Sequence, residues 1–280
     1  MNGILIVNKE KNVTSRDVVN DIMHIFNTKK VGHTGTLDPI ATGVLVITIG
    51  RFTKLGDALI STEKEYIATM ELGYETDTLD NTGTILKSNN KSLSEKQIKE
   101  AIYSMKGEYD QEVPAYSAVK INGKKLYEYA RNNESIELPK RRVNIKEIEV
   151  LEINGNIVKF KTTVSKGTYI RSLIRDIAYK LETYASMTDL IRTKQGKFNI
   201  EEAYTVSDIR NGNYNLKEEA DALDIEELNI DQELYKKIDN GLPFEKEYQK
   251  EYILFIYNNE KIAIYKYNGI EYRMYLKLNV

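Results

Sequence analysis

The sequence contains no cysteine and only two histidines, at positions 24 and 33. The absence of cysteine excludes disulfides, thiolate nucleophiles and cysteine-ligated zinc or iron–sulfur sites, and it fits an intracellular enzyme. Two histidines are too few for a histidine-rich metal site. We therefore expect neither a disulfide nor a metal centre in this chain.

Long apolar runs are also lacking. The longest falls far short of the roughly 18 residues that span a bilayer, and the opening MNGILIVNKEKN has neither the long apolar segment nor the cleavage site of a signal peptide. We expect a cytoplasmic protein that does not contact a membrane. The 280 residues, 41% hydrophobic and 29% charged, are typical of one large domain with a small appendage, or of two domains.

The formal net charge of -2 conceals an uneven distribution. Residues 114–198 contain 17 Lys and Arg against 9 Asp and Glu, whereas residues 199–251 contain 6 against 15. Because charges attract one another only within about 8 to 10 Å in physiological salt, the local sign decides what binds. A basic run alone is often only a solvated face. In YSAVKINGKKLYEYARNN, however, tyrosines alternate with cations, and this combination suits single-stranded or looped RNA.

The hydrophobic pattern predicts both helices and strands. Strands are expected at residues 3–9, 43–49, 65–73, 142–153 and 156–165, and three more in EYILFIYN, KIAIYKYN and IEYRMYLKL at the end of the chain. Helices are expected after an N-cap at Thr14 or Ser15, in SLSEKQIKEAIYSMKG, and over residues 168–181. The three closing strands are separated by NE and NG turn signals, and they predict a small separate β module.

The segment GHTGTLDPIATGVL (residues 32–45) carries a single carboxylate, Asp38, in a basic neighbourhood. Positive neighbours favour the ionised, nucleophilic form of a carboxyl group. Pro39 holds Asp38 in the extended region, and the glycines at 32 and 35 allow backbone to pass close to a ligand. The segment is not a phosphate-binding P-loop, because no Gly-Lys-Ser/Thr follows at the required spacing. Taken alone, an aspartate that bonds its own backbone in a turn is the simpler interpretation.

Further segments accompany this loop in a fixed order: KEYIATMELGYETDTLDNTG, PAYSAVKINGKKLYEYAR and SKGTYIRSLIRDIA. Together they closely resemble the TruB family of bacterial tRNA pseudouridine-55 synthases over about residues 3–200. YKKIDNGLPF and the final strands resemble, more weakly, a PUA-type RNA-binding module. The resemblance implies an α+β pseudouridine synthase fold with a mixed, largely antiparallel sheet. Residues 1–225 are expected to form the catalytic domain, with a thumb loop at about 114–140, and residues 226–280 a PUA-like module.

The resemblance also implies a reaction. Uridine 55 in the T loop of tRNA is flipped out of its stack, its bond from N1 to the ribose is broken, and the turned base is rejoined through C5. Nothing is oxidised and no group is imported, so we expect no cofactor. The expected partner is tRNA, bound through its T arm by a monomer that needs no other protein.

Three residues carry the implied chemistry. Asp38 matches the family's essential aspartate, which attacks the ribose or the base or removes a ribose proton. Arg171 matches the arginine that pairs with it, and Tyr66 matches the tyrosine that stacks on the target base. The structural alternatives are a half-buried strand tyrosine and an arginine on the surface of a helix N-terminus.

The implied substrate contacts surround these three. His33 matches the residue that fills the space left by the flipped base, and Tyr169 and Leu190 match pocket-lining positions, with core packing as their alternative. In the thumb, four cations are expected to grip phosphates: Lys120, Lys124, Lys125 and Arg131.

Lys9 is also expected to take part in substrate binding. It lies in the opening NKEKNVTS, where this chain departs from the family pattern of Lys-Pro followed by glycine. Glu10 replaces the proline and Asn12 the glycine. Asparagine tolerates the left-handed conformation better than other non-glycine residues, so the turn is expected to survive.

Two other functions remain open. The first is a guide-RNA-dependent catalytic subunit of the box H/ACA type, which shares the central motifs but is disfavoured by the compact length and small tail. The second is an RNA-folding helper without catalysis, which the intact Asp38, Tyr66 and Arg171 disfavour. Activity without partner proteins separates the stand-alone enzyme from both.

Overall fold

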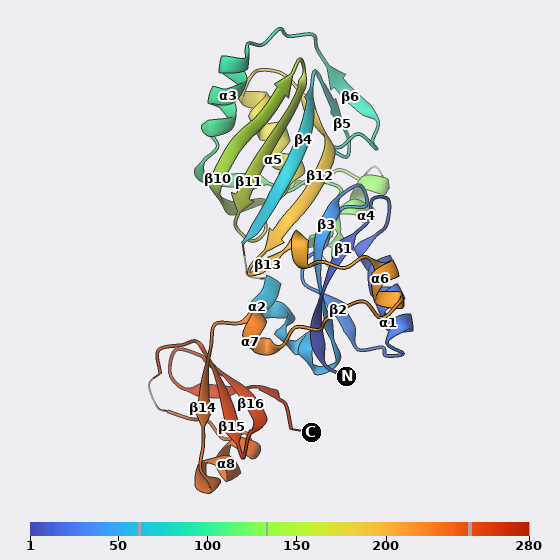
Figure 1. Ribbon diagram of the computed structural model, residues 1–280. Coiled ribbons are helices and arrows are strands. Elements are labelled where there is room, and N and C mark those ends of the chain that lie inside the picture. Colours follow the sequence, from blue (N-terminus) through green and yellow to red (C-terminus); the bar gives the residue numbers. More distant parts are fainter. Residues whose placement is uncertain (61–62, 133, 246–247, 280) are drawn as a thin grey trace.

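The computed structural model describes residues 1–60, 63–132, 134–245 and 248–279. Figure 1 shows a large sheet at one end of an elongated molecule and a small C-terminal sheet at the other. No described helix is long and apolar enough to cross a membrane. The two sheets correspond to the large domain and the small module that the hydrophobic pattern predicts.

Among the described residues, nine strands form the large sheet, in the order β1-β3-β12-β4-β11-β10-β7, with β2 beside β3 and β13 beside β12. The strands are β1 (Gly3–Lys9), β2 (Val31–His33), β3 (Thr42–Ile49), β4 (Lys64–Leu72), β7 (Gly107–Glu112), β10 (Lys140–Asn154), β11 (Ile157–Val164), β12 (Ala185–Gln195) and β13 (Phe198–Asn199). Only β3 and β12 pair in parallel; the other described pairs of this sheet are antiparallel. The predicted mixed, largely antiparallel α+β fold is therefore confirmed.

The helices begin where the sequence supplies caps. In α1 (Ser15–Ile25), the Thr14 hydroxyl accepts a hydrogen bond from the backbone N–H of Asp17, so Thr14 is the N-cap. Ser94 caps α3 (Glu95–Tyr103) in the same way. The remaining helical segments are η1 (Gly50–Leu55), α2 (Gly56–Ile60), α4 (Leu126–Arg131), α5 (Ile170–Lys180), η2 (Ile200–Glu202), α6 (Val206–Arg210), α7 (Glu219–Ala222) and α8 (Gln232–Asp239).

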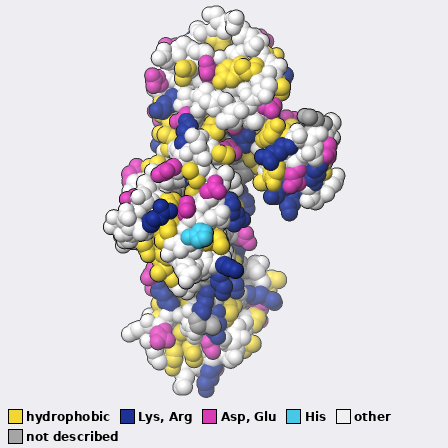
Figure 2. Space-filling model, turned by 90° about the vertical axis from the view of Figure 1, so that its right-hand side faces the viewer, with side chains coloured by type: hydrophobic (Ala, Val, Ile, Leu, Met, Phe, Trp, Pro, Cys, Tyr) yellow, Lys and Arg dark blue, Asp and Glu magenta, His cyan; other side chains and the backbone are white. Residues whose placement is uncertain are grey.

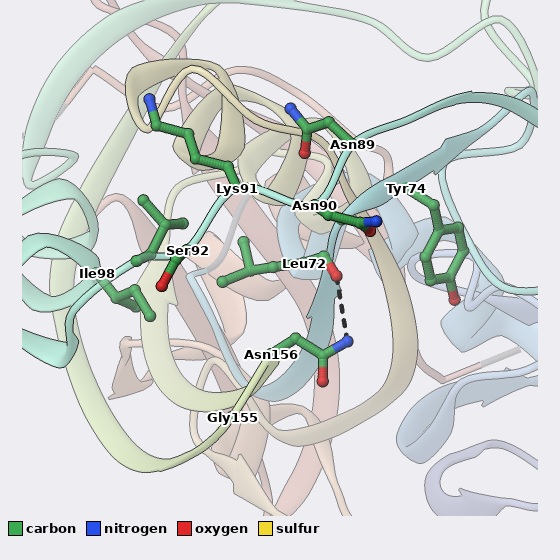
Figure 3. A pocket seen from close by; sticks show the side chains of 11 residues that line it. Leu72, Tyr74, Asn89, Asn90, Lys91, Ser92, Ile98, Gly155 and Asn156 are labelled. Carbon is green, nitrogen blue, oxygen red and sulfur yellow. Dashed lines mark hydrogen bonds between the residues drawn. The ribbon is translucent and has the colours of Figure 1, made fainter.

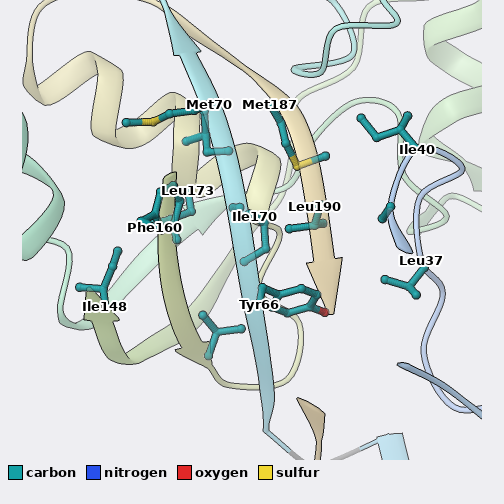
Figure 4. Close-up of a cluster of buried hydrophobic side chains, with 14 of the residues drawn as sticks. Leu37, Ile40, Tyr66, Met70, Ile148, Phe160, Ile170, Leu173, Met187 and Leu190 are labelled. Atoms are coloured by element: carbon teal, nitrogen blue, oxygen red, sulfur yellow. The ribbon is translucent and has the colours of Figure 1, made fainter. Parts of the chain in front are cut away.

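The main core lies between the large sheet and the helices α1, α3 and α5. Its buried side chains include Met70, Phe160 and Leu173, which Figure 4 draws around β4 and β11. The continuous apolar run that predicts a doubly buried strand is β3, whose residues from 43 to 49 are all buried. The core thus fixes the strands from which the candidate site is built.

Four strands of the large sheet were not predicted: β2 and β13, which are only three and two residues long, and two longer strands, β12 and β7. In β12 the pairing with β4 shifts register between Met187 and Asp189 and again between Arg192 and Lys194. These bulges break the alternation by which a strand is recognised in a sequence. The other, β7, has the polar sequence GEYDQE and lies at the sheet edge.

The C-terminal module is a four-stranded sheet of β14 (Ile225–Asn229), β15 (Tyr252–Tyr257), β16 (Glu260–Tyr267) and β17 (Tyr272–Lys277). The last three are the predicted strands. The acidic segment contributes the unpredicted β14, parallel to β15. A shared apolar cluster docks the module on the large sheet, with Ile4 and Val46 on one side and Leu254 and Leu276 on the other.

Two small hairpins complete the chain. One joins β5 (Tyr74–Thr76) to β6 (Ile85–Ser88), and the other joins β8 (Lys120–Ile121) to β9 (Lys124–Lys125). The second hairpin and α4 form the thumb segment, between β7 and β10. At the root of the thumb, the backbone N–H of Val113 donates to the carbonyl of Pro139 at 3.0 Å, so the two ends of the segment lie side by side.

Candidate active site

Asp38 lies in the segment between β2 and β3, and the two apolar residues around it hold it in place. Leu37 and Ile40 are buried in the main core, with exposed fractions of 3% and 4%. The Ser15 hydroxyl accepts a hydrogen bond from Leu37 N–H at 2.9 Å and donates to its carbonyl at 3.2 Å. The Asp38 side chain itself keeps 31% of its surface exposed. The carboxylate is therefore open to a ligand while its backbone is fixed.

Arg171 pairs with this carboxylate from the start of α5. Its Nη2 donates to Oδ1 of Asp38 at 2.9 Å, and Nε lies 2.9 Å from Oδ2. The Nε–H makes no hydrogen bond, however, so the pair has one hydrogen bond and one close ionic contact. Arg171 also donates to the carbonyls of Thr78 at 2.8 Å and Tyr116 at 3.0 Å. With 6% of its side chain exposed, it is not the surface arginine of the structural alternative.

Tyr66 and Leu190 lie beside each other near the Asp38 loop. Both belong to the main core cluster, with exposed fractions of 7% and 4%. In Figure 4, the Tyr66 ring lies next to Leu190 and Ile170, and its hydroxyl points toward the segment that carries Leu37. The structure thus places an aromatic ring and an apolar side chain in the core cluster that also buries Leu37 and Ile40, on either side of Asp38 in the chain.

His33 ends β2, and its imidazole is neutral at neutral pH. Burial lowers the pKa of His33, and the positive charges of Arg16 and Arg192 lower it further. Its Nδ1 accepts from the backbone N–H of Gly35 at 3.4 Å, so the ring packs against the loop. A neutral ring can pack in a stack of bases without a charge to desolvate.

Tyr169 is the N-cap residue of α5, two positions before Arg171. Burial raises the pKa of Tyr169 above its ordinary value, so its phenol keeps its proton at neutral pH. The backbone of Tyr169 is bonded to Gln111 of β7. The phenol ring of Tyr169 and the guanidinium of Arg171 therefore both belong to residues at the N-terminal end of α5.

Lys9 has a different place from the one predicted. It is fully buried at the end of β1, and its Nζ donates to the carbonyls of Glu10, Val13 and Pro39 at 2.9, 2.6 and 3.2 Å. A buried ammonium group on three carbonyls does not reach RNA. Lys9 instead holds the residue that follows Asp38, and burial lowers its pKa to about 8.

The turn after Lys9 forms as predicted, with Asn12 in the left-handed region at φ 65°. The Asn12 N–H donates to the carbonyl of Pro39 at 2.8 Å. The departure from the family pattern at this position therefore leaves the support of the Asp38 loop intact.

Two further residues hold the loop and were missed in the sequence. Arg192 in β12 is 1% exposed and donates to the carbonyls of Gly35 at 3.0 Å and Val44 at 2.6 Å. Gln195 donates to the carbonyl and hydroxyl of Thr34 at 2.7 and 2.8 Å. The strands approach so closely that a Cβ on Gly43 would lie 2.3 Å from the Arg192 carbonyl oxygen. The local sequence LIRTKQ gives no signal for these roles, because four of its six residues are polar or charged.

The thumb cations lie apart from this buried group. Lys124 pairs with Glu134 at 2.6 Å and lies 4.4 Å from the centre of the Tyr129 ring. Lys125 and Arg131 lie over the ring of Tyr127, while the Lys120 side chain is exposed. Figure 2 shows a projecting lobe at the height of α4 whose surface carries Lys and Arg beside Asp and Glu.

The cavities do not mark this site. A cavity of about 500 Å³ lies at the other end of β4, lined by Leu72, Tyr74, Asn89 and Asn156 among others (Figure 3). Among the described residues, no group of three or more His, Asp or Glu side chains could hold a metal ion. The open part of the site is instead the Asp38 side chain, which is 31% exposed.

The chain has clear relatives. Residues 23–170 match the model of the TruB family pseudouridylate synthase N-terminal domain, and residues 171–234 match that of the tRNA pseudouridylate synthase B C-terminal domain. The chain is 40% identical to tRNA pseudouridine synthase B of Caldicellulosiruptor saccharolyticus over 99% of both proteins. It is 45% identical to the Clostridium tetani protein of that name, over 86% of this chain and 85% of the relative. A chain in the crystal structure of a Cbf5-Nop10-Gar1 complex is 25% identical, with a TM-score of 0.72 over 98% of this chain and 85% of that one.

Proposed function

The chain belongs to the TruB family of pseudouridylate synthases, and on this premise we propose that it converts uridine 55 in the T loop of tRNA into pseudouridine. The observation that carries this proposal is the pairing of Asp38 with the buried Arg171, in a loop whose Leu37 and Ile40 share the core cluster of Tyr66. The guanidinium orients the carboxylate, while the exposed part of Asp38 can meet a substrate.

The reaction needs the target base outside its stack, which costs a few kcal/mol. The flipped uracil lies against the face of Tyr66 and the side chain of Leu190, and Tyr169 contacts it from the start of α5. The neutral ring of His33 occupies the space that the base leaves. These contacts offset the cost of flipping, because they replace the base stacking of the T loop with aromatic and apolar contact.

Asp38 carries the chemistry. Its carboxylate attacks C1′ of the ribose or the base, or it removes a ribose proton, and the bond from N1 to C1′ breaks. The base then turns, C5 bonds to C1′ as any bond to Asp38 breaks, the C5 hydrogen leaves as a proton, and N1 takes up a proton. The formula of the nucleotide is unchanged, so the residues need only bind, orient and transfer protons.

Phosphate contacts position the RNA. In this proposal four cations of the thumb make them: Lys120, Lys124, Lys125 and Arg131. We assign residues 1–225 to catalysis and residues 226–280 to a PUA-like module that contacts tRNA beyond the T arm. Such contacts set the register and orientation of the RNA but do not select its sequence.

The test is to incubate the purified protein alone with unmodified tRNA and to map pseudouridine. We expect modification at position 55, and none when that position is cytidine or when the protein carries Asp38→Asn. Modification at another position would overturn the site assignment. A protein that modifies tRNA only when guide RNA and partner proteins are added would instead act as a guide-RNA-dependent subunit. Binding without modification under any of these conditions would support the folding helper.

A further inference from the structure

Gln111 of β7 is a buried polar residue, 1% exposed, whose carboxamide is aimed at one residue of the site. Its Oε1 accepts from the backbone N–H of Tyr169 at 2.7 Å, and its Nε2 donates to the carbonyl of the same residue at 3.2 Å. Nε2 also donates to the hydroxyl of Tyr109 at 2.6 Å. One amide side chain therefore binds both backbone polar groups of Tyr169.

Tyr169 needs an external partner because it cannot cap its own helix. It occupies the N-cap position of α5 in an extended conformation, with φ -102° and ψ 116°, and its side chain makes no capping hydrogen bond. Serine, threonine, aspartate or asparagine at this position would fix the entry of the chain into the helix through a side-chain oxygen. In this chain the entry into the helix is fixed instead by Gln111 of β7, which lies 58 positions earlier in the sequence.

The same strand leads directly into the thumb. Gln111 is two residues before Val113, where the thumb closes on Pro139, and it lies opposite Arg141 in the ladder between β7 and β10. Neighbouring contacts join the same two elements: the Ser172 hydroxyl donates to the carbonyl of Glu112 at 2.8 Å. The root of the thumb and the N-terminus of α5 are thus bonded as one unit.

We propose that Gln111 is a positioning residue for the isomerisation: it holds the backbone of Tyr169 so that the ring keeps the orientation in which it contacts the flipped uracil. This inference rests on the proposed function, in which Tyr169 contacts the base. Gln111 itself touches neither substrate nor the Asp38 carboxylate. Through its strand it also joins the position of the thumb root to that of the ring.

Two substitutions separate the parts of the interaction. Gln111→Met keeps the length of the side chain and removes all three hydrogen bonds. Gln111→Glu keeps an acceptor for the Tyr169 N–H, but as a carboxylate it has no donor for the carbonyl. At saturating tRNA, we expect Gln111→Met to lower the single-turnover rate roughly 10- to 100-fold. The dissociation constant of tRNA should change less than about threefold, because phosphate contacts carry the binding.

The pH dependence of the single-turnover rate distinguishes the loss of a hydrogen bond from the loss of a packing contact. A protonated glutamic acid has both a donor and an acceptor, as the amide has. Burial favours this neutral form. The single-turnover rate of Gln111→Glu, divided by that of the wild type, should therefore rise as the pH falls from 8 to 6, while the ratio for Gln111→Met stays flat.

The control removes another buried hydrogen bond near the opposite end of α5. The Thr183 hydroxyl, in a side chain 3% exposed, donates to Oδ1 of Asn89 at 2.6 Å, and Asn89 is drawn in Figure 3. Thr183→Val should lower the melting temperature and leave the rate within about twofold, since it touches nothing near Asp38.

A double-mutant cycle decides whether Gln111 acts through Tyr169. Gln111→Met lowers the single-turnover rate of the otherwise wild-type protein by some factor. In the Tyr169→Ala background it should lower the rate by less than about a third of that factor, because the ring to be positioned is gone. Additive losses, or a Gln111→Met rate within threefold of the wild type, would overturn the inference. If Gln111→Met does not fold, a flat pH ratio for Gln111→Glu overturns it equally. A wild-type chain that does not modify position 55 refutes the proposed function itself, whereas the outcomes above refute only the role of Gln111.

Discussion

The loop around Asp38 and the thumb are held in opposite ways. The loop of residues 34–41 receives hydrogen bonds from β1, α1, α5 and β12, all distant in the sequence. In the described part of the thumb, most contacts are local, such as Lys124 with Glu134 and the Tyr129 hydroxyl with the carbonyl of Ile121 at 3.2 Å. We infer from this difference that the fold fixes the reacting groups, whereas the thumb can change its contacts with RNA.

The loop contains the change with the largest expected effect. Asp38→Asn keeps the shape of the side chain but removes its nucleophilic and basic character, so turnover should fall by about 10⁴-fold or more. The binding of tRNA should remain largely intact, because the thumb cations are unchanged. The measurement is the release of tritium from tRNA labelled at C5 of uridine, with filter binding alongside. Substantial turnover by this variant would remove Asp38 from the chemistry.

Arg171→Lys should have the next largest effect. A lysine can supply a charge near Asp38 but cannot at once reach the carbonyls of Thr78 and Tyr116, so the carboxylate loses its orientation. We expect turnover to fall roughly 10²-fold, measured in single-turnover reactions.

The matched control for Arg171→Lys is Arg175→Lys, one turn later on α5. Arg175 is also buried and pairs with Glu112 and Asp176. This substitution should lower the melting temperature at least as much as Arg171→Lys but reduce turnover far less. Equal losses of turnover would mean that any disturbance of α5 impairs the site.

The sequence predicted those parts of the structure that depend on residues close to one another in the chain. The N-cap of α1 at Thr14, one of the two candidates, the left-handed Asn12 and the doubly buried β3 all follow from local chemistry. The family and the fold class were also confirmed, because the motifs resemble the family in order along the chain.

The supports of the site could not be predicted, because their partners are remote. Arg192 lies 157 positions from Gly35, and Gln111 lies 58 from Tyr169. Two bulges in β12 also hide the strand that presents Arg192, since they break its alternation. Lys9 was expected to bind substrate, but its Nζ donates to three carbonyls inside the fold, a place that lysine rarely takes and that its neighbours in the sequence do not reveal.

Lys9 offers a pH test of the loop's rigidity. Burial lowers its pKa from the usual 10.5 to about 8, so between these values the unfolded chain holds more protons on Lys9 than the folded chain does. The free energy of unfolding contributed by Lys9 therefore rises with pH in this window and declines as pH falls toward 8. Relative to Lys9→Met, the wild type should gain about 1.5 kcal/mol between pH 8 and 9.5.

Urea denaturation at several pH values measures this difference. Lys64, whose pKa is also lowered to about 8, is present in both proteins, and its contribution cancels. Lys124→Met in the thumb is the control, and its difference from the wild type should stay flat over the same window. A flat difference for Lys9→Met would show that Lys9 is hydrated in solution and that the loop is looser than described.

The smallest expected effect belongs to the thumb. Replacing Lys124 and Lys125 together by Gln should flatten the log–log dependence of tRNA binding on salt by about 0.7 to 0.9 for each phosphate that the variant no longer neutralises. All RNAs should be weakened alike, because phosphate contacts carry no sequence information. Since Lys124 is paired with Glu134, it must exchange that partner for a phosphate. Glu134→Gln should therefore do the opposite, with tighter binding and a steeper salt dependence. If neither variant changes the salt dependence of tRNA binding, the RNA does not contact the thumb. The contrast between a fixed loop and a thumb that changes its contacts with RNA would then be wrong.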